Sequence, residues 1–347
     1  MNRTIDGLLV ALVLALGAIS TTVIFAANHS LALNQIIFWV FGLAVLYIAS
    51  HMFHTAWQKY SLPIYVFSIV ALLFVFLFGS QIRGSVRWID LGVFRFQPSE
   101  IAKVATVILL ANYFNTRTAS NLYNLAISLL LILPVFTMIF LQPDLGSALA
   151  IAAIWLGVTT AAGIEKKHIA LLVVSFIVFS LFAYEILAPF QKARIATFIN
   201  PNKDPLGAGY NIIQSKIAVG SGQLTGRGLG LGSQSQLNFL PESESDFIFA
   251  SIAEQLGFFG SGLVIIIFGT ILLRLTNYLK NAERFNQLII IGALSLLTYQ
   301  FLVNIGMNMG ILPVTGITLP FVSYGGSSLI SMLLLLGIIF STRVQNY

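Results

Sequence analysis

The stretch GLLVALVLALGAISTTVIFAA, Gly7 to Ala27, runs for 21 residues without a charged side chain. A helix of about 20 apolar residues is long enough to cross the hydrocarbon core of a bilayer. Similar runs fill the chain almost end to end: they lie near 7–27, 35–56, 61–80, 98–115, 122–142, 145–163, 168–188, 247–273, 286–308 and 319–341. The sequence therefore predicts an all-α, polytopic membrane protein of about ten transmembrane helices, forming one domain over residues 1–347.

The composition supports this class and excludes others. Of the 347 residues, 57% are hydrophobic and 9% are charged, whereas a soluble domain carries roughly 25% charged residues. The net charge of +6, without a long basic run, points to membrane orientation or an anionic substrate and not to nucleic acid. The absence of cysteine excludes disulfides and thiol chemistry, and the four histidines lack metal-ligand spacing. The first apolar run follows Arg3 as a signal peptide would, but it is longer than a usual signal core, so we expect a retained helix.

The basic residues predict the orientation of the chain, because cytoplasmic loops carry an excess of Lys and Arg. With a cytoplasmic N-terminus, one set of basic residues falls on the inner side: Arg3, Lys59, Arg117, Lys166, Lys167, Arg274, Lys280, Arg284 and Arg343. We therefore expect both termini in the cytoplasm.

Two outer loops depart from this rule. Residues 81–97 carry Arg83, Arg87 and Arg95, on the side where cations are normally sparse. Residues 189–246 form the one large extracytoplasmic loop, in which YNIIQSKIAVG (Tyr210 to Gly220), with Lys216, predicts a short interfacial helix. The glycine-rich run 220–233 matches no nucleotide-binding motif, so we expect it to form tight turns near the membrane surface.

Ionisable residues within or beside membrane spans are rare and usually functional. Pro98 suits a first helical turn, and Glu100 and Lys103 share one face of the helix that follows, where they form either an internal pair or part of a substrate cavity. Asp144 is either the N-cap of the helix after it or a catalytic group, and the N-cap is favoured. Asn304 and Asn308 share a face and favour hydrogen bonding between helices.

Asp246, in SDFIFASIAEQLG, stands just before an apolar span that itself carries Glu254. An N-cap is the simpler interpretation of Asp246. Glu254, however, lies about two turns, or roughly 12 Å, deeper on a similar face, and outward-facing cations stand opposite this acidic region. A carboxylate together with Arg and Lys is what transfer from a diphosphate leaving group requires, since the carboxylate removes a proton and the cations stabilise the departing charge. We infer that Asp246 both caps the helix and acts as a base.

Several motifs, in order along the chain, resemble those of the SEDS family of bacterial membrane proteins. The motifs are RWIDLGVFRFQPSEIAK, QPDLGSA, DPLGAGYNIIQSKIAVGSG, SQSQLNFLPE, SDFIFASIAEQLG and LPFVSYGGSS, which span Arg87 to Ser328. The combination of FRFQPSE, IIQSK and QSQLNFLPE is closer to the elongation branch of that family, typified by RodA, than to the division branch, typified by FtsW.

The resemblance implies a peptidoglycan glycosyltransferase that polymerises lipid II on the outer face of the bacterial cytoplasmic membrane, in cell elongation and shape maintenance. It assigns the essential aspartate of the family to Asp246. The substrate-binding residues that we expect are Arg83, Arg87, Glu100, Lys103, Asp144, Lys216 and Ser323. Relatives often carry E-x-H-T-D up to this aspartate, whereas Ser243, Glu244 and Ser245 follow Glu242 here, so the resemblance does not extend to an imidazole at that place.

The resemblance also implies partners: a class B penicillin-binding protein, which is a transpeptidase, and the elongation machinery. The sequence leaves open whether a divalent cation, Mg²⁺ or Mn²⁺, assists, and no other cofactor is expected. A lipid II flippase, a non-catalytic scaffold and a division-type polymerase are the alternatives. A flippase would need polar groups in the inner half of the bilayer, whereas the unusual charges here lie on the outer side. A scaffold would not explain an aspartate facing cations.

Overall fold

The structure is a computed structural model that describes residues 5–82, 85–90, 92, 95–172, 174, 175, 192, 196–201, 204, 205, 207, 209–237, 239–280 and 282–342. Within these residues, six helices are long and apolar enough to cross a membrane: α1 (Gly7–Ala27), α2 (His29–His51), α4 (Ser61–Phe78), α6 (Leu122–Leu141), α12 (Ile248–Asn277) and α13 (Arg284–Asn308). Two further apolar helices are shorter, α7 (Leu145–Ala161) and α14 (Gly326–Ser341). The prediction of an all-α, polytopic membrane protein is confirmed.

Nine of the ten expected spans each overlap an observed helix, and the largest differences in boundary are in α2 and α14. The span expected at 168–188 lies mostly outside the described residues. Helix α2 begins six residues earlier than expected, because the side chain of Asn28 accepts hydrogen bonds from the first backbone N–H groups and caps the helix there. Helix α14 begins at Gly326, seven residues later than expected, and residues 319–325 are not helical.

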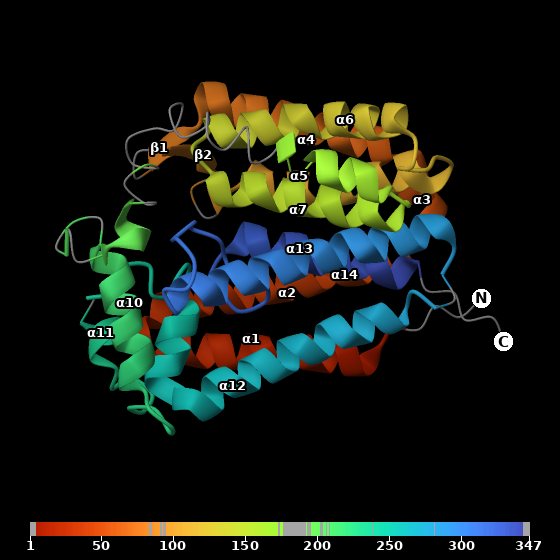
Figure 1. Cartoon of the computed structure of the whole chain (residues 1–347). Coiled ribbons are helices and arrows are strands. Elements are labelled where there is room, and N and C mark those ends of the chain that lie inside the picture. The colour runs from red at the N-terminus through yellow and green to blue at the C-terminus, as the bar shows by residue number, and fades with distance from the viewer. Residues whose placement is uncertain are drawn as a thin grey trace.

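Helix α5 (Pro98–Asn115) occupies the interior of the bundle. It contacts α4, α7, α13 and α14, and 14 of its 18 residues are buried. Because protein and not lipid surrounds it, it tolerates polar side chains that a lipid-facing helix would not. Around it, α14 packs along α2, α13 packs against α7, and α1 packs against α2 and α12 (Figure 1).

The bundle has two distinct ends (Figure 1). Helix α1 begins and α14 ends at one end, which we call the terminal end and where α3 (His54–Lys59) also lies. At the opposite end, which we call the loop end, lie strand β2, helix α10 (Tyr210–Ser221) and helix α11 (Ser233–Gln236). The short helix expected at 210–220 is confirmed as α10. The two termini of the helical bundle therefore lie on the same side.

The loop between α4 and α5 forms a small antiparallel sheet, which the sequence did not predict. Strand β1 (Ser80–Ile82) pairs with β2 (Ser85–Asp90), and β2 pairs with β3 (Arg95–Phe96) in the register Ile89 opposite Phe96. The sheet leads directly into Pro98, the first residue of α5. It therefore fixes the entry of α5 at the loop end.

Helix α12 is broken at Gly257, which adopts a positive φ of 67° that favours glycine. The break leaves the carbonyls of Glu254 and Gln255 without helical partners, and these accept hydrogen bonds from the N–H groups of Arg227 and Gly228 at 2.9 and 3.1 Å. A side chain on Gly222 could not fit, because its Cβ would come within 1.8 Å of a backbone oxygen of α12. The glycine-rich run thus forms the expected tight turns, and it completes the broken helix.

Candidate active site

The turn that carries Asp246, residues 241–247, is held by its own main chain. Three successive carbonyls accept hydrogen bonds from other groups: Ser243 from the Ser251 hydroxyl at 2.8 Å, Glu244 from the Tyr324 N–H at 2.8 Å, and Ser245 from the Ser323 hydroxyl at 2.7 Å. Two of these three donors belong to the segment before α14. Each bond fixes the backbone and leaves the side chains of the turn unconstrained by it.

The fourth carbonyl, that of Asp246 itself, accepts two hydrogen bonds, from the side-chain amides of Asn304 and Asn308, both at 3.0 Å. The side-chain oxygen of Asn308 also accepts the N–H of Ala250 at 2.9 Å, in the first turn of α12. The prediction that Asp246 caps α12 is therefore wrong: the N-cap residue is Phe247, without a side-chain hydrogen bond, and Asn308 supplies a cap from another helix. The prediction that the two asparagines join helices is confirmed.

The side chain of Asp246 is half-buried and lies beside Gly316. A Cβ built on Gly316 would come within 3.5 Å of Asp246 Oδ2, and Gly316 has a positive φ of 74°, so a side chain there would be strained as well as close. The neighbouring Ile317 packs against Gly146, near the start of α7. Residues 309–325, which we call the connecting segment, thus bring the Asp246 turn close to the start of α7.

Lys216 and Ser323 lie around the same turn. The Ser215 hydroxyl donates to the carbonyl of Asn308 at 2.7 Å, and the stem of the exposed Lys216 passes Gly310. Ser323 is buried, and its hydroxyl holds the Asp246 turn as described above. The geometry therefore gives Ser323 a positioning contact, while the predicted substrate-binding roles of Lys216 and Ser323 stay predictions.

Arg87 and Asp144 form a second cluster at the loop end. The guanidinium of Arg87 lies 3.8 Å from Asp144 Oδ1 and donates from Nε to the Gln142 carbonyl at 2.9 Å and from Nη2 to the Pro143 carbonyl. Asp144 is buried and accepts the Ser147 N–H at 3.1 Å, so the favoured interpretation of Asp144 as an N-cap, here of α7, is confirmed. Arg83 lies outside the described residues.

We predict that Arg87→Lys lowers both the melting temperature and the turnover, because a single ammonium cannot replace a guanidinium that holds two carbonyls and a carboxylate. The expected loss of stability is about 1.5–3 kcal/mol, the usual range for hydrogen bonds to a charged group. Arg95→Lys is the matched control, since Arg95 is exposed and its pair with Asp90 is as long, at 3.8 Å. If Arg87→Lys had the wild-type melting temperature and turnover, the contacts of the Arg87 guanidinium would have no role in stability or activity.

Glu100 and Lys103 form the buried ion pair that their spacing predicted. The Lys103 Nζ to Glu100 Oε1 distance is 2.8 Å, and the two residues are 4% and 1% exposed. Glu100 lies in the first turn of α5, three residues after Gln97, whose side chain donates to Asp144 Oδ2 at 3.3 Å. The pair is therefore adjacent in the chain to the Arg87–Asp144 cluster.

Among the described residues, the carboxylate of Glu254 accepts hydrogen bonds from α11 and forms no ion pair. Its carboxylate accepts the N–H groups of Gln234 and Ser235, at 2.8 and 3.0 Å, and the Ser235 hydroxyl at 2.8 Å. It therefore caps the short helix α11 and does not extend an acidic region from Asp246. Among the described residues, no group of three or more His, Asp or Glu side chains converges as metal ligands would. The divalent cation that the sequence left open stays untested by this observation, because Mg²⁺ needs only one or two carboxylates together with substrate phosphates.

Gln35 is a contributor that sequence reasoning missed. It is fully buried in α2, and its side-chain amide donates to the carbonyl of Ser323 at 3.2 Å. It therefore supports the residue whose hydroxyl holds the Asp246 turn. A lone glutamine within an otherwise apolar span was the signal that could have identified it.

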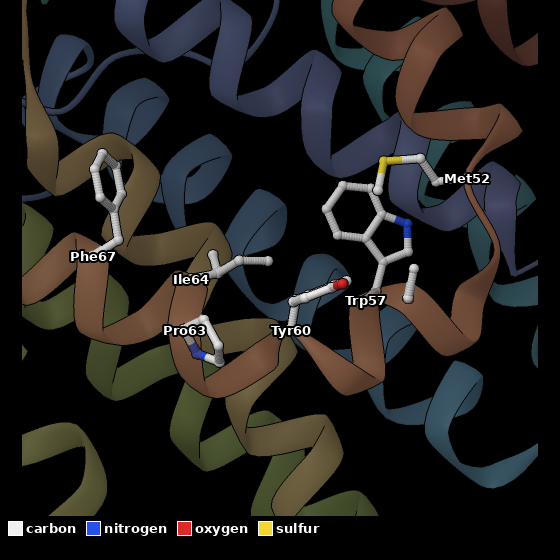
Figure 2. A pocket seen from close by; sticks show the side chains of 7 residues that line it. Met52, Trp57, Tyr60, Pro63, Ile64 and Phe67 are labelled. Atoms are coloured by element: carbon white, nitrogen blue, oxygen red, sulfur yellow. The ribbon is translucent and has the colours of Figure 1, made fainter.

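A separate cavity of about 370 Å³ lies away from these clusters, where α3 meets α4 (Figure 2). Its lining is almost wholly apolar: Met52, Ala56, Trp57, Tyr60, Pro63, Ile64 and Phe67. Because α3 lies at the terminal end, this cavity is at the opposite end of the bundle from α10 and α11 (Figure 1).

Comparisons with known proteins found one matching family, similar proteins and similar solved structures. Residues 4–347 match the model of the FtsW/RodA/SpoVE family, described as cell cycle proteins. The peptidoglycan glycosyltransferase MrdB of Escherichia coli K12 is 38% identical over 308 residues, covering 88% of this chain and 83% of that protein. A solved chain from a peptidoglycan synthase complex that coordinates polymerization and crosslinking superposes with a TM-score of 0.86, at 29% identity, over 96% of both chains. RodA of Thermus thermophilus superposes with a TM-score of 0.74, at 27% identity, over 97% of this chain and 95% of that one.

Proposed function

We propose that this chain, which belongs to the FtsW/RodA/SpoVE (SEDS) family, polymerises lipid II into glycan strands at the outer face of the cytoplasmic membrane, with Asp246 as the catalytic base. Peptidoglycan glycosyltransferase activity itself follows from the relatives, since the match covers nearly the whole chain. The similarity to MrdB and to RodA supports a role in cell elongation.

One observation most strongly supports Asp246 as the catalytic base. Four successive carbonyls, from Ser243 to Asp246, are fixed by hydrogen bonds from other parts of the fold. These bonds position a half-buried carboxylate without using its oxygens. Holding a reacting group in advance lowers the entropy cost of reaching the transition state.

In the proposed reaction, Asp246 accepts the proton of the acceptor sugar hydroxyl while that oxygen bonds to the anomeric carbon of the donor. The bond from this carbon to the diphosphate oxygen breaks, and its electron pair leaves with undecaprenyl diphosphate, so the anomeric configuration inverts. General-base transfer of this kind typically contributes about 10²–10⁴-fold. The reaction as written routes no step through a metal.

Cations are needed where the diphosphate departs. Lys216 is the best candidate among the described residues, because it is exposed and its neighbour Ser215 contacts the asparagine that holds Asp246. We propose that Lys103, with Glu100, shapes the interior of the same site. We propose that Arg87 supports the site through its hydrogen bonds to the carbonyls of Gln142 and Pro143. Arg83 stays a substrate-binding residue proposed from the sequence.

The alternative of a lipid II flippase has a direct test. Lipid II is supplied only to the outer leaflet of proteoliposomes, and both glycan polymer and movement of lipid II to the inner leaflet are measured. We expect polymer from the outer pool without net movement. Movement without polymer would favour the flippase.

We propose a class B penicillin-binding protein as the partner, together with the elongation machinery. The support is that a superposing chain comes from a complex of polymerization and crosslinking. Addition of the purified transpeptidase is expected to increase the polymerisation rate. A rate that is the same with and without it would count against this partner.

Orientation is a further proposal, and the lack of native cysteine makes its test clean. We propose cytoplasmic termini, so Leu231→Cys, in the exposed turn of the loop end, should react with a membrane-impermeant thiol reagent in intact cells. Lys280→Cys, just after α12, should react only after lysis. If Lys280→Cys reacted in intact cells and Leu231→Cys reacted only after lysis, the chain would have the opposite orientation.

A further inference from the structure

Four buried polar atoms on α5 and α13 have no hydrogen-bond partner among the described residues. They are Ser99 Oγ, Glu100 Oε2 and the two amide atoms of Gln300, Oε1 and Nε2. Gln300 is fully buried within α13. Buried polar groups in folded proteins are nearly always hydrogen-bonded, so a group of unpaired ones needs an explanation.

The register of α13 against α5 brings these atoms to the same level of the bundle. Arg284, at the start of α13, donates to the carbonyl of Phe114 near the end of α5 at 3.0 Å, so the two helices are antiparallel. Further along, a Cβ on Gly292 would lie 2.9 Å from Val107 Cγ1. A further eight residues along α13 reach Gln300, and the corresponding step back along α5 reaches Ser99 and Glu100.

The helical faces agree with this register. Glu100, Lys103 and Val107 are spaced three and four residues apart, so they share the face of α5 that meets α13. Gly292 and Gln300 are eight residues apart, and that spacing also returns to one side of a helix. Gly292 meets both Val107 of α5 and Val158 of α7, so Gln300 lies at the level of the buried ion pair on the broad face of α13 that packs inside the bundle.

The unpaired groups are chemically complementary. Glu100 Oε2 only accepts hydrogen bonds when ionised, whereas Gln300 Nε2 donates and its Oε1 accepts. No direct bond joins them, and buried waters typically make about three hydrogen bonds to groups of this kind. We propose that Gln300 is a positioning residue for the Glu100–Lys103 pair, holding the second oxygen of Glu100 through a buried water that Ser99 also contacts. The proposed link to activity rests on the proposed glycosyltransferase function.

Gln300→Met tests this, because methionine keeps the length of the side chain and removes both hydrogen-bonding atoms. We expect the rate of lipid II polymerisation to fall roughly ten- to hundredfold, the effect of losing a hydrogen bond to a charged group. Leu296→Met, one turn earlier in α13 and also buried, is the matched control and should polymerise at the wild-type rate. Wild-type polymerisation by Gln300→Met would overturn the proposal.

Thermal melting provides a readout that does not depend on activity. Gln300→Met should lower the melting temperature of the wild-type chain, but not that of a Glu100→Met/Lys103→Met background, because the partner oxygen is then absent. If Gln300 is instead an isolated unpaired amide, its replacement should raise the melting temperature equally in both backgrounds, which would overturn the proposal. Absence of polymer from the wild-type chain would count against the proposed function, and the melting comparison would still decide the role of Gln300.

Discussion

Replacing Asp246 by asparagine is expected to abolish glycan polymerisation while leaving folding and lipid II binding intact. Asparagine keeps the size of the side chain but cannot accept the proton of the acceptor hydroxyl. The expected loss is at least the roughly 10²–10⁴-fold that general-base transfer supplies. The measurement compares the variant with the wild-type chain in polymer yield, lipid II affinity and melting temperature.

The structure explains why this variant should fold. The turn is held through the carbonyls of residues 243–246, which the substitution leaves in place, and the cap of α12 comes from Asn308. Glu244→Gln is the matched control, since it makes the same change two residues away in the same turn and should polymerise normally. If Asp246→Asn formed polymer at nearly the wild-type rate, the carboxylate would not be the base.

Lys103→Met should cause the largest loss of stability. It strands the carboxylate of Glu100 in the interior, and removing one partner of a buried ion pair costs about 3–5 kcal/mol. The swapped double variant Glu100→Lys/Lys103→Glu should recover much of the melting temperature but not polymerisation, because the charges then face the site in the wrong order. Recovery of both would assign the pair a purely structural role.

Lys167→Met is the control for burial. Its pair with Glu165 has almost the same length, 2.7 Å, but the two side chains are 69% and 44% exposed. Exposed pairs contribute about 0–1 kcal/mol, so this variant should melt close to the wild-type temperature. If Lys103→Met and Lys167→Met lowered the melting temperature equally, burial would not explain the contribution of the Glu100–Lys103 pair to stability.

Local patterns in the sequence were sufficient for much of the fold. Apolar runs predicted the spans, the three-residue spacing predicted the Glu100–Lys103 pair, and Asp144 before an apolar run predicted its N-cap. Each of these features joins residues that are close in the chain. Periodicity and capping rules address such contacts directly.

Features that join distant residues could not be predicted in this way. The cap of α12 comes from Asn308, 58 residues beyond the N–H that it accepts, and Arg87 is held by carbonyls 55 and 56 residues away. The glycine-rich loop packs against α12 at the break at Gly257, so Glu254 caps α11 and does not join Asp246. The sequence predicted that Asp246 lies at the start of α12, but the way in which its turn is held depends on tertiary contacts.

Polymerisation of lipid II by the purified chain tests the central proposal most directly. Wild-type protein is incubated with lipid II, with and without a class B penicillin-binding protein, and glycan length is measured on a gel. We predict glycan strands from the wild-type chain, longer or more abundant with the transpeptidase, and none from Asp246→Asn. A wild-type chain that is folded and binds both lipid II and the transpeptidase, yet forms no glycan, would contradict the proposal.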